Sequence, residues 1–292
     1  MLIAFLKVAE HLSVSAAAAE LDVGKGVVSK RVAQLESAVK ATLFSRTTRK
    51  VALTPAGEAY LEFARRALLE VSSAEERLRD LRTELTGQIR LTASVSWGQL
   101  VLARCLPNFL LLHPAIEIEL LLIDRMMDLA RERIDIALRW TSALTPGLSA
   151  VPVADIEWVV AAAPSYLVTA GIPVEPQDLA THSCMCYWRE SSDDAWVLCA
   201  GTRRERVRVR GRYHANNAET VAEAALAGLG IALLPRYLCR AALADGRLVH
   251  VLPAWTPETS FGTRVVAMVA PERMRVRRNQ VLIAYLRQQL GG

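Results

Sequence analysis

The chain has 292 residues, of which 52% are hydrophobic and 22% are charged, a composition typical of globular proteins and long enough for about two domains. No unbroken apolar run reaches the roughly 20 residues of a membrane-spanning helix, and the N-terminal residues are too short and wrongly flanked for a signal peptide. The net charge of +5 permits nucleic-acid binding without requiring it, and we expect a cytoplasmic protein with no membrane partner.

Basic residues are concentrated in one stretch near the N-terminus. Seven lysines and arginines lie between Gly24 and Lys50, against a single acidic residue, Glu36. The net charge of this stretch is therefore +6, which exceeds the +5 of the whole chain. Such a local excess is the electrostatic footprint expected of a surface that binds phosphates.

Three helices are predicted in the first forty or so residues. Apolar residues at helical spacing predict one helix over residues 2–9 and another over residues 16–21, which Ser13 or Ser15 can cap. After a tight turn, a third helix would bury an apolar face and expose a polar one, formed by Lys25, Ser29, Lys30 and Gln34 with Arg31 at its flank. Two short helices and a tight turn are the helix-turn-helix pattern. A plain helical hairpin with a solvated basic face has the same pattern, so both interpretations stand at this point.

A short β-hairpin and a long helix follow. Residues 46–50 read as a basic turn between two extended pieces, and Thr54 with Pro55 predicts the start of a helix, since threonine is a good N-cap and proline suits the first helical position. A hairpin in this place is the wing of a winged helix-turn-helix. We predict that one group of residues faces the major groove of DNA and that another contacts the phosphate backbone or minor groove: Lys25, Ser29, Lys30 and Arg31 in the first, and Arg46, Arg49 and Lys50 in the second. Arg46 has an alternative role, which is to hold the wing together.

These residues resemble the signature of the LysR-type transcriptional regulators. The resemblance is carried by Ala17-Ala18, Leu21, Val28-Ser29, Leu35-Glu36, Leu43-Phe44-Ser45-Arg46 and Leu53-Thr54-Pro55-Ala56-Gly57. It implies a winged helix-turn-helix domain over residues 1–57 that binds double-stranded promoter DNA as a homodimer or, as is usual in the family, a homotetramer. One departure is at the start of the third helix, where the family usually has a serine and a glutamine and this chain has Gly24, Lys25 and Gly26. The residues that read the bases therefore differ from the family pattern.

The helix that begins at Thr54 is predicted to continue to about Leu85. Its apolar residues recur at alternating spacings of four and three, as in a coiled-coil seam, and are Tyr60, Ala64, Ala67, Val71, Ala74, Leu78, Leu81 and Leu85. Such a stripe either joins two chains or packs against the downstream domain of its own chain, and we favour the dimer. The resemblance likewise implies a linker and dimerisation helix, over residues 58–87.

The rest of the chain alternates between predicted strands and helices, which indicates an α/β fold with a largely parallel sheet. Strands are expected at residues 88–93, 116–123, 134–138, 158–163, 196–199, 206–212, 230–234 and 263–269. Helices are expected at residues 97–112, 126–133, 164–170, 219–227, 235–244 and 276–290, and residues 141–151 are expected to be irregular.

This part resembles the LysR-type effector domain, which is similar to type 2 periplasmic binding proteins. The resemblance is carried by Asp128-Leu129, Asp135-Ile136-Ala137-Leu138-Arg139 and the run from Ala227 to Pro235. It implies an effector-binding domain over residues 88–292 made of two subdomains, residues 88–162 with 267–292 and residues 163–266. A cleft between the subdomains would hold a small-molecule effector.

Candidate effector-binding residues lie where predicted strands end. Ligands of α/β sheets bind beyond the carboxyl ends of the strands, and a helix N-terminus suits an anion. The resemblance maps effector contacts to three such loops, whose candidates are Ser94, Ser96, Trp97, Trp140 and Asn217, with Arg125 as a further one. The alternative for each residue alone is a helix cap or a surface side chain. A cleft with aromatic walls and an anion-binding loop would suit a small aromatic or carboxylic acid.

Enzyme signatures are not found. Gly228-Leu229-Gly230 lies between a predicted helix and a following strand, the reverse of the order in a dinucleotide-binding loop, and the five histidines have no ligand spacing. Cys184-Met185-Cys186 lacks the second Cys or His pair of a zinc site, so its redox role stays open. We therefore expect no enzyme, metal or cofactor. The alternative function is a small-molecule-binding protein without specific DNA binding, whose first domain only mediates assembly.

Overall fold

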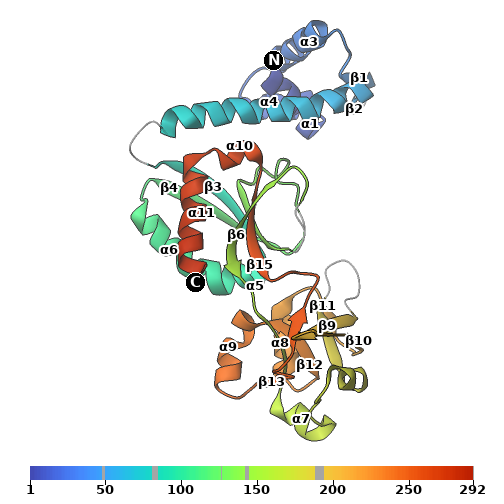
Figure 1. Ribbon diagram of the computed structural model, residues 1–292. Helices are drawn as coiled ribbons and strands as arrows, with labels where there is room; N and C mark the ends of the chain where they lie inside the picture. The colour runs from blue at the N-terminus through green and yellow to red at the C-terminus, as the bar shows by residue number, and fades with distance from the viewer. Residues whose placement is uncertain (48–49, 81–84, 126, 142–144, 188–193, 292) are drawn as a thin grey trace. The chain divides into compact units, whose positions relative to one another are not determined.

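The computed structural model describes residues 1–47, 50–80, 85–125, 127–141, 145–187 and 194–291. The chain divides into two compact units, Met1–Leu81 and Arg82–Gly292 (Figure 1). The first is mainly helical, and the second is built on three β-sheets with helices packed around them. The predicted order, a helical domain followed by an α/β domain, is confirmed.

The first unit contains the predicted helices and hairpin. Its elements are α1 (Leu2–His11), α2 (Val14–Glu20), α3 (Lys25–Val39), β1 (Phe44–Thr47), β2 (Lys50–Leu53) and α4 (Pro55–Asp80). The two strands pair antiparallel, with Phe44 opposite Leu53 and Thr47 opposite Lys50. Phe5, Val28 and Leu43 form the centre of a common core of the three helices and the hairpin.

Two hydroxyl groups cap helices in this unit. The Ser13 side chain accepts a hydrogen bond from the Ala16 amide (3.3 Å), and Thr54 Oγ1 accepts one from the Gly57 amide (3.0 Å). Gly57 also permits a close approach, because a Cβ atom there would lie 2.1 Å from the carbonyl oxygen of Leu43. The start of α4 is thus fixed against the chain segment that leads into the hairpin.

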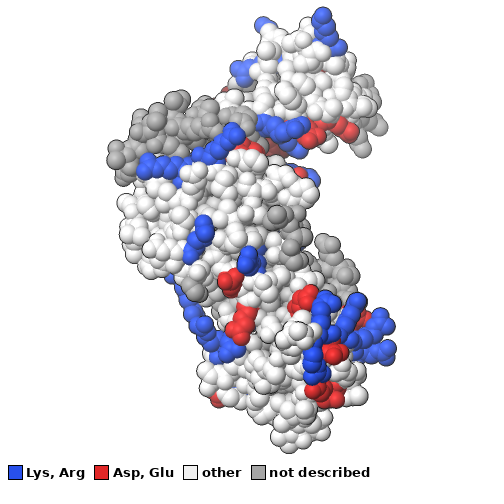
Figure 2. Space-filling model, in the orientation of Figure 1, with Lys and Arg blue, Asp and Glu red and all other residues white. Residues whose placement is uncertain are grey.

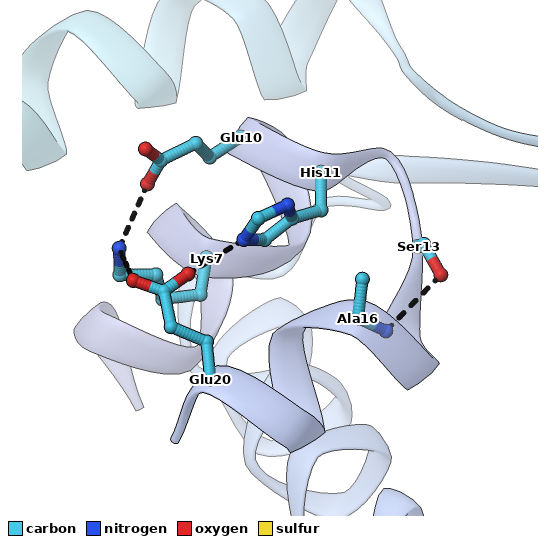
Figure 3. Close-up of polar contacts among 6 residues, drawn as sticks. All are labelled: Lys7, Glu10, His11, Ser13, Ala16 and Glu20. Atoms are coloured by element: carbon cyan, nitrogen blue, oxygen red, sulfur yellow. Dashed lines mark hydrogen bonds and ion pairs between the residues drawn. The ribbon is translucent and has the colours of Figure 1, made fainter.

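A cluster of charged side chains joins α1 to α2 (Figure 3). Glu20 on α2 reaches both Lys7 and His11 on α1, with 2.5 Å between Glu20 Oε2 and His11 Nε2, and Lys7 also contacts Glu10 at 2.9 Å. The hydrogen bonds from Lys7 and then His11 lower the pKa of Glu20. Burial acts to lower the pKa of Lys7, but the hydrogen bonds to Glu20 and Glu10 outweigh it, so that this pKa is raised.

The long helix α4 ends earlier than predicted. Its described part ends at Asp80, and Leu85 is not helical. Leu85 instead packs against the core of the second unit, just before a strand that begins at Gly87 with a φ of 108°. The prediction that Leu85 belongs to the helical seam is therefore wrong, because its side chain serves the adjoining domain.

One five-stranded sheet of the second unit has the strand order β4-β3-β5-β15-β6. The strands are β3 (Gly87–Ala93), β4 (Ile116–Leu122), β5 (Ile136–Trp140), β6 (Ser149–Asp155) and β15 (Arg264–Val269). Helices pack on it: a continuous run of α5 (Val95–Trp97), a π-turn (Gly98–Leu102) and α6 (Ala103–Leu112), and then α10 (Pro271–Met274) and α11 (Arg277–Leu290).

The helical run Val95–Leu112 is long and apolar enough to cross a membrane by length and composition, and it is the one such run in the described part of the chain. The core helix of a soluble protein passes the same test. Leu102, Leu106 and Phe109 of this run are buried in the core, and Phe109 lies against Tyr285 of α11 with 5.2 Å between ring centroids. These contacts are those of a core helix.

The other five-stranded sheet has the order β11-β8-β12-β7-β13, and a three-stranded antiparallel sheet has the order β10-β9-β14. The strands are β7 (Trp158–Ala162), β8 (Cys184–Tyr187), β9 (Ala195–Ala200), β10 (Arg203–Arg208), β11 (His214–Ala215), β12 (Ile231–Pro235), β13 (Val249–Val251) and β14 (Thr256–Glu258). The helices are α7 (Pro164–Ala170), a 3₁₀-helix (Pro176–Thr181), α8 (Ala218–Leu226) and α9 (Arg236–Ala244).

The sheets are mixed rather than largely parallel. In each five-stranded sheet four strands run in one direction, and the strand that follows a crossover from the other sheet, β7 or β15, runs antiparallel to both of its neighbours. The two crossovers lie between Asp155 and Trp158 and between Glu258 and Arg264. The predicted subdomain boundaries at residues 162 and 267 are therefore displaced, because β7 pairs within the second subdomain and all of β15 pairs within the first.

Three further predictions need local correction. Residues 129–133 form turns rather than a helix, since the Asp128 carboxylate accepts hydrogen bonds from the Ala130 and Arg131 amides at 3.0 and 3.1 Å. Strand β5 begins at Ile136 and includes Trp140, which was expected to lie in a loop. The stretch expected to be irregular contains the first three residues of β6, which pairs with β15.

Candidate functional site

The outward face of α3 is basic, as predicted. Val28, Val32 and Leu35 are buried, while Lys25, Lys30 and Arg31 are exposed and Ser29 is half-buried. Figure 2 shows lysine and arginine side chains at the edge of the first unit, over α3. Within the described residues, no acidic side chain forms an ion pair with these three cations, so their charge is available to an external anion.

No side chain caps the start of α3. Its N-cap is Gly24, which has extended backbone angles and no side chain to satisfy the first helical amides. A Cβ atom at Gly24 or Gly26 would meet nothing within 4 Å. Packing within the chain therefore does not require these glycines. Val27, which follows them, is 42% exposed.

Glu36 has a structural role that the sequence analysis did not assign. Its carboxylate oxygen Oε1 accepts hydrogen bonds from the backbone amides of Leu43 (2.8 Å) and Phe44 (3.1 Å). The single acid of the basic stretch therefore ties α3 to the first strand of the wing. Its isolation among cations, together with its place in the family signature, was the available signal.

The wing itself is present, but its basic side chains are not all described. The backbone of Arg46 lies in β1 and that of Lys50 in β2. Arg49, and the side chains of Arg46 and Lys50, lie outside the described residues. Their predicted contacts with DNA stay predictions.

The seam predicted along α4 is used in part by the first unit itself. Ala64 is fully buried, and Tyr60 packs edge-on against Phe5 with 5.3 Å between ring centroids. Ala64 belongs to the core of its own unit, so the prediction that it faces a partner chain is wrong. Tyr60 is half-buried against this core, and its predicted place in the seam is not tested. Two exposed apolar residues follow the same side of the helix, Phe63 at 60% and Val71 at 56%, with half-buried Ala67 between them.

The remaining positions of the seam are not tested. The side chains of Ala74 and Leu78 and the whole of Leu81 lie outside the described residues. Phe63 was missed at the sequence level because the spacing pattern placed the seam on Tyr60 and Ala64 instead. Only the packing of α1 against α4 decides which apolar residues are covered.

Four of the six predicted effector residues lie at one place. Ser94, Ser96 and Trp97 follow β3, and Trp140 ends β5, and all four are at least nine-tenths buried. Tyr237 of α9, which was not predicted, joins them: its hydroxyl is 3.0 Å from Ser96 Oγ, and its ring centroid is 6.1 Å from that of Trp140. These residues meet between the subdomain of β3 and β5 and that of α9.

Only some of the polar groups at this place have a hydrogen-bond partner among the described residues. The Ser94 hydroxyl is buried, and no hydrogen-bond partner for it is found among the described residues. The Val95 amide donates to the Asp124 carboxylate at 3.0 Å. The expectation of free amides for an anion is thus corrected in part, since a carboxylate of the chain already occupies the start of the helix.

The other two predicted residues have local roles. Arg125 is exposed and forms an ion pair with Glu132 at 3.1 Å. The Asn217 side chain accepts a hydrogen bond from the Thr220 amide at 3.1 Å and so caps α8. For these two residues the surface and helix-cap alternatives describe what the structure shows.

Two cavities are bordered by none of the six predicted residues. One, of about 490 Å³, is bordered by Trp158, Trp196, Arg206 and the second crossover. The other, of about 440 Å³, lies between α7 and β13.

The described residues contain no group of three or more His, Cys, Asp or Glu side chains placed to hold a metal ion. Cys184 is fully buried in β8, while the side chain of Cys186 lies outside the described residues. Burial raises the pKa of the Cys239 thiol to about 11, which keeps it protonated near neutral pH.

Two family models match the chain: the bacterial regulatory helix-turn-helix protein of the lysR family over residues 1–58, and the LysR substrate binding domain over residues 82–291. The chain is 34% identical to the HTH-type transcriptional regulator PtxR of Pseudomonas aeruginosa, in a match that covers 99% of this chain and 92% of that protein. It is 30% identical to the HTH-type transcriptional regulator DmlR of Escherichia coli, with 97% and 92% covered.

Solved structures match the chain over both of its units. CrgA, a LysR-type transcriptional regulator from Neisseria meningitidis, is 27% identical with a TM-score of 0.60, and 98% of this chain and 97% of that chain are covered. The Vibrio cholerae virulence activator AphB is similar in fold, with 24% identity, a TM-score of 0.61 and the same coverage. The chain therefore belongs to the LysR family of transcriptional regulators, in which a DNA-binding helix-turn-helix domain precedes an effector-binding α/β domain.

Proposed function

We propose that α3 docks in the major groove of promoter DNA while the wing contacts the backbone beside it. The observation that carries this proposal is the exposed basic face of α3, whose cations form no ion pair with the described residues. Basic side chains suit guanine edges and phosphates. The groove contacts are Lys25, Ser29, Lys30 and Arg31, and the wing contacts are Arg46, Arg49 and Lys50.

Val27 adds an apolar element to this surface. It is exposed on α3, between the uncapped helix start and Lys30. An apolar side chain in the major groove recognises the methyl group of thymine. We assign Val27 to such a contact, which would give sequence selectivity that lysine–phosphate contacts lack.

The test is binding of the full chain to DNA from the region upstream of its own gene, over a series of salt concentrations. Removal of one contact with a phosphate reduces the slope of log affinity against log salt by about 0.9. Arg49→Ala in the wing should weaken binding and reduce this slope, and Arg31→Ala in the groove should weaken binding. Arg240→Ala, which removes an exposed arginine of α9, should change neither the affinity nor the slope. Binding that is absent or insensitive to salt would favour the alternative, a small-molecule-binding protein whose first domain only mediates assembly.

The effector site is assigned to the place where Ser94, Ser96, Trp140 and Tyr237 meet. The buried Ser94 hydroxyl supports this assignment, since buried polar groups are normally hydrogen-bonded and an exception needs a partner. An effector with an aromatic ring and a hydrogen-bonding group would satisfy Ser94 and stack near Trp140, replacing the contact between Ser96 and Tyr237. A thermal-shift screen of small metabolites, guided by neighbouring genes, would identify it.

We further propose a homodimer formed through the exposed apolar side of α4, and a homotetramer formed when the effector domains pair separately. Phe63 and Val71 support the first contact, because with Ala67 between them they line one side of the helix, and contiguous exposed apolar patches mark interaction surfaces. A chain of this kind would act in the cytoplasm, where its DNA lies, and would need no catalytic group or cofactor.

A further inference from the structure

The cavity of about 490 Å³ lies where the second crossover meets the strands β9 and β10. Residues 259–261 of the crossover form one border, and Trp158, the first residue after the other crossover, forms part of the wall. Its volume falls within the range of small-molecule sites, about 300–1,000 Å³. None of the residues predicted to bind the effector borders it.

The wall of the cavity is aromatic and held in place. Trp158 stacks on Phe261, with 5.6 Å between ring centroids and 26° between ring planes. The Trp158 indole N–H donates to the carbonyl oxygen of Gly262 at 2.8 Å, which ties the two crossovers together. Trp196 of β9 also borders the cavity. A planar ligand would therefore meet a preformed surface.

The charged groups of the cavity leave one cation unbalanced. Arg204 and Glu258 form two hydrogen bonds of 2.9 and 3.0 Å, and the bond from Arg204 lowers the pKa of Glu258, so this pair is ionised and neutral overall. Arg206 borders the same cavity, is exposed, and has no ion pair or hydrogen bond among the described residues. The cavity therefore carries a net positive charge at Arg206.

The next arginine on the same face of β10 provides a contrast. Side chains alternate along a strand, so Arg204, Arg206 and Arg208 point to one face of the sheet. Arg208 pairs with Asp194 at 3.4 Å and does not border the cavity. Figure 2 shows arginines and acidic side chains interspersed at the lower right, over β9 and β10. Among these three arginines, Arg206 is the one whose charge is not neutralised by a described residue, so it is available to a ligand.

We propose that this cavity binds a small aromatic carboxylate, with its ring against the Trp158–Phe261 wall and its carboxylate on the Arg206 guanidinium. Arginine binds carboxylates through two parallel hydrogen bonds, and such charge-assisted bonds are about twice as strong as neutral ones. Trp158 also lies against Trp140 of the proposed effector site, with 5.8 Å between ring centroids, so the two sites are neighbours that share no lining residue. Because both crossovers border the cavity, a bound ligand would contact the segments that join the two subdomains.

The test is calorimetric titration of the full chain with benzoate, phenylacetate and cinnamate. The neutral analogues benzamide, phenylacetamide and cinnamamide serve as matched ligands. At least one acid should bind, with its amide roughly tenfold weaker, the size of effect expected when about 1.4 kcal/mol of charge-assisted bonding is lost. Arg206→Gln should weaken the acid by a similar factor, and Arg206→Lys by less, since lysine keeps the charge without the fork. The control Arg208→Gln should leave the affinity unchanged.

Three results would overturn the proposal: none of the acids binds, amide and acid bind equally, or Arg206→Gln and Arg206→Lys both bind as the unchanged chain does. Ser96→Ala separates this site from the proposed effector site. If Ser96→Ala abolishes acid binding and Arg206→Gln does not, the acid occupies the effector site and the cavity proposal fails. Failure to bind promoter DNA would count against the proposed function alone, because acid binding is measured without DNA.

Discussion

At the scale of single residues, two neighbouring serines have opposite roles. The Ser96 hydroxyl bonds to Tyr237, whereas the Ser94 hydroxyl is buried and none of the described residues offers it a partner. A hydrogen bond is worth about 1 kcal/mol net, while removal of an unsatisfied buried group costs little or is stabilising. We therefore expect Ser96→Ala to lower the free energy of unfolding by about 1 kcal/mol and Ser94→Ala to leave it unchanged or raise it. Urea denaturation of both variants measures the difference, and equal destabilisation would show that Ser94 is already satisfied.

The lowered pKa of Glu20 predicts how the stability of the first unit changes at acidic pH. Its pKa is lowered from the ordinary value of 4.5, chiefly by the hydrogen bond from Lys7. A carboxyl with a lowered pKa adds stability that is present above its unfolded pKa and is lost as the pH falls through its folded pKa. The first unit should therefore lose stability as the pH falls below 4.5, and Glu20→Gln should flatten that dependence. Unfolding measured over a pH series checks this, with the exposed Glu117→Gln of the second unit as control. An unchanged slope in Glu20→Gln would contradict the role of this cluster.

At the scale of elements, α4 has a covered side and an exposed apolar side. Ala64 is inside the first unit, while Phe63 and Val71 are exposed. If the exposed side joins two chains, Phe63→Glu with Val71→Glu places charges in the interface and should halve the mass measured by sedimentation. The control Arg65→Glu introduces a negative charge on the opposite side of the same helix and should leave the mass unchanged. A double variant that stays fully assembled would exclude this surface as a required interface.

At the scale of the whole molecule, the chain consists of two units with separate cores. Multidomain proteins unfold in more than one step, so we expect two transitions in calorimetry. Glu36→Ala removes two hydrogen bonds to a half-buried carboxylate and should destabilise the first unit by about 2 kcal/mol. Only the transition of that unit should move, and the exposed Ser37→Ala should move neither. A single transition that shifts as a whole would show that the two units unfold together.

Elements with a strong local signal were predicted well. The periodicities of α3, α7 and α11, the threonine cap of α4 and the order of the two domains all follow from neighbouring residues. Short strands such as β8, β11, β13 and β14 were missed, because a few residues carry little periodicity and their pairing partners are distant in the chain. The direction of β7 and β15 also depends on distant partners, so a parallel sheet was predicted where a mixed one forms.

The candidate sites divide in the same way. The basic face of α3 is a property of one helix and was predicted from its own spacing. Tyr237 was missed because it lies 141 residues from the Ser96 hydroxyl that it contacts. Arg206 had no local feature to separate it from Arg204 and Arg208, since only the positions of Glu258 and Asp194 show which charges are neutralised.

The sequence by itself determined the family, the order of the domains and the positive charge of α3, because each depends on residues close together in the chain. Tertiary structure alone decided which side of α4 is left exposed, which buried hydroxyl has no partner among the described residues and which arginine at the cavity is not neutralised by one of them. These properties depend on whether side chains far apart in the chain cover or neutralise one another. That is settled by packing across the helices of the first unit and across the two crossovers of the second.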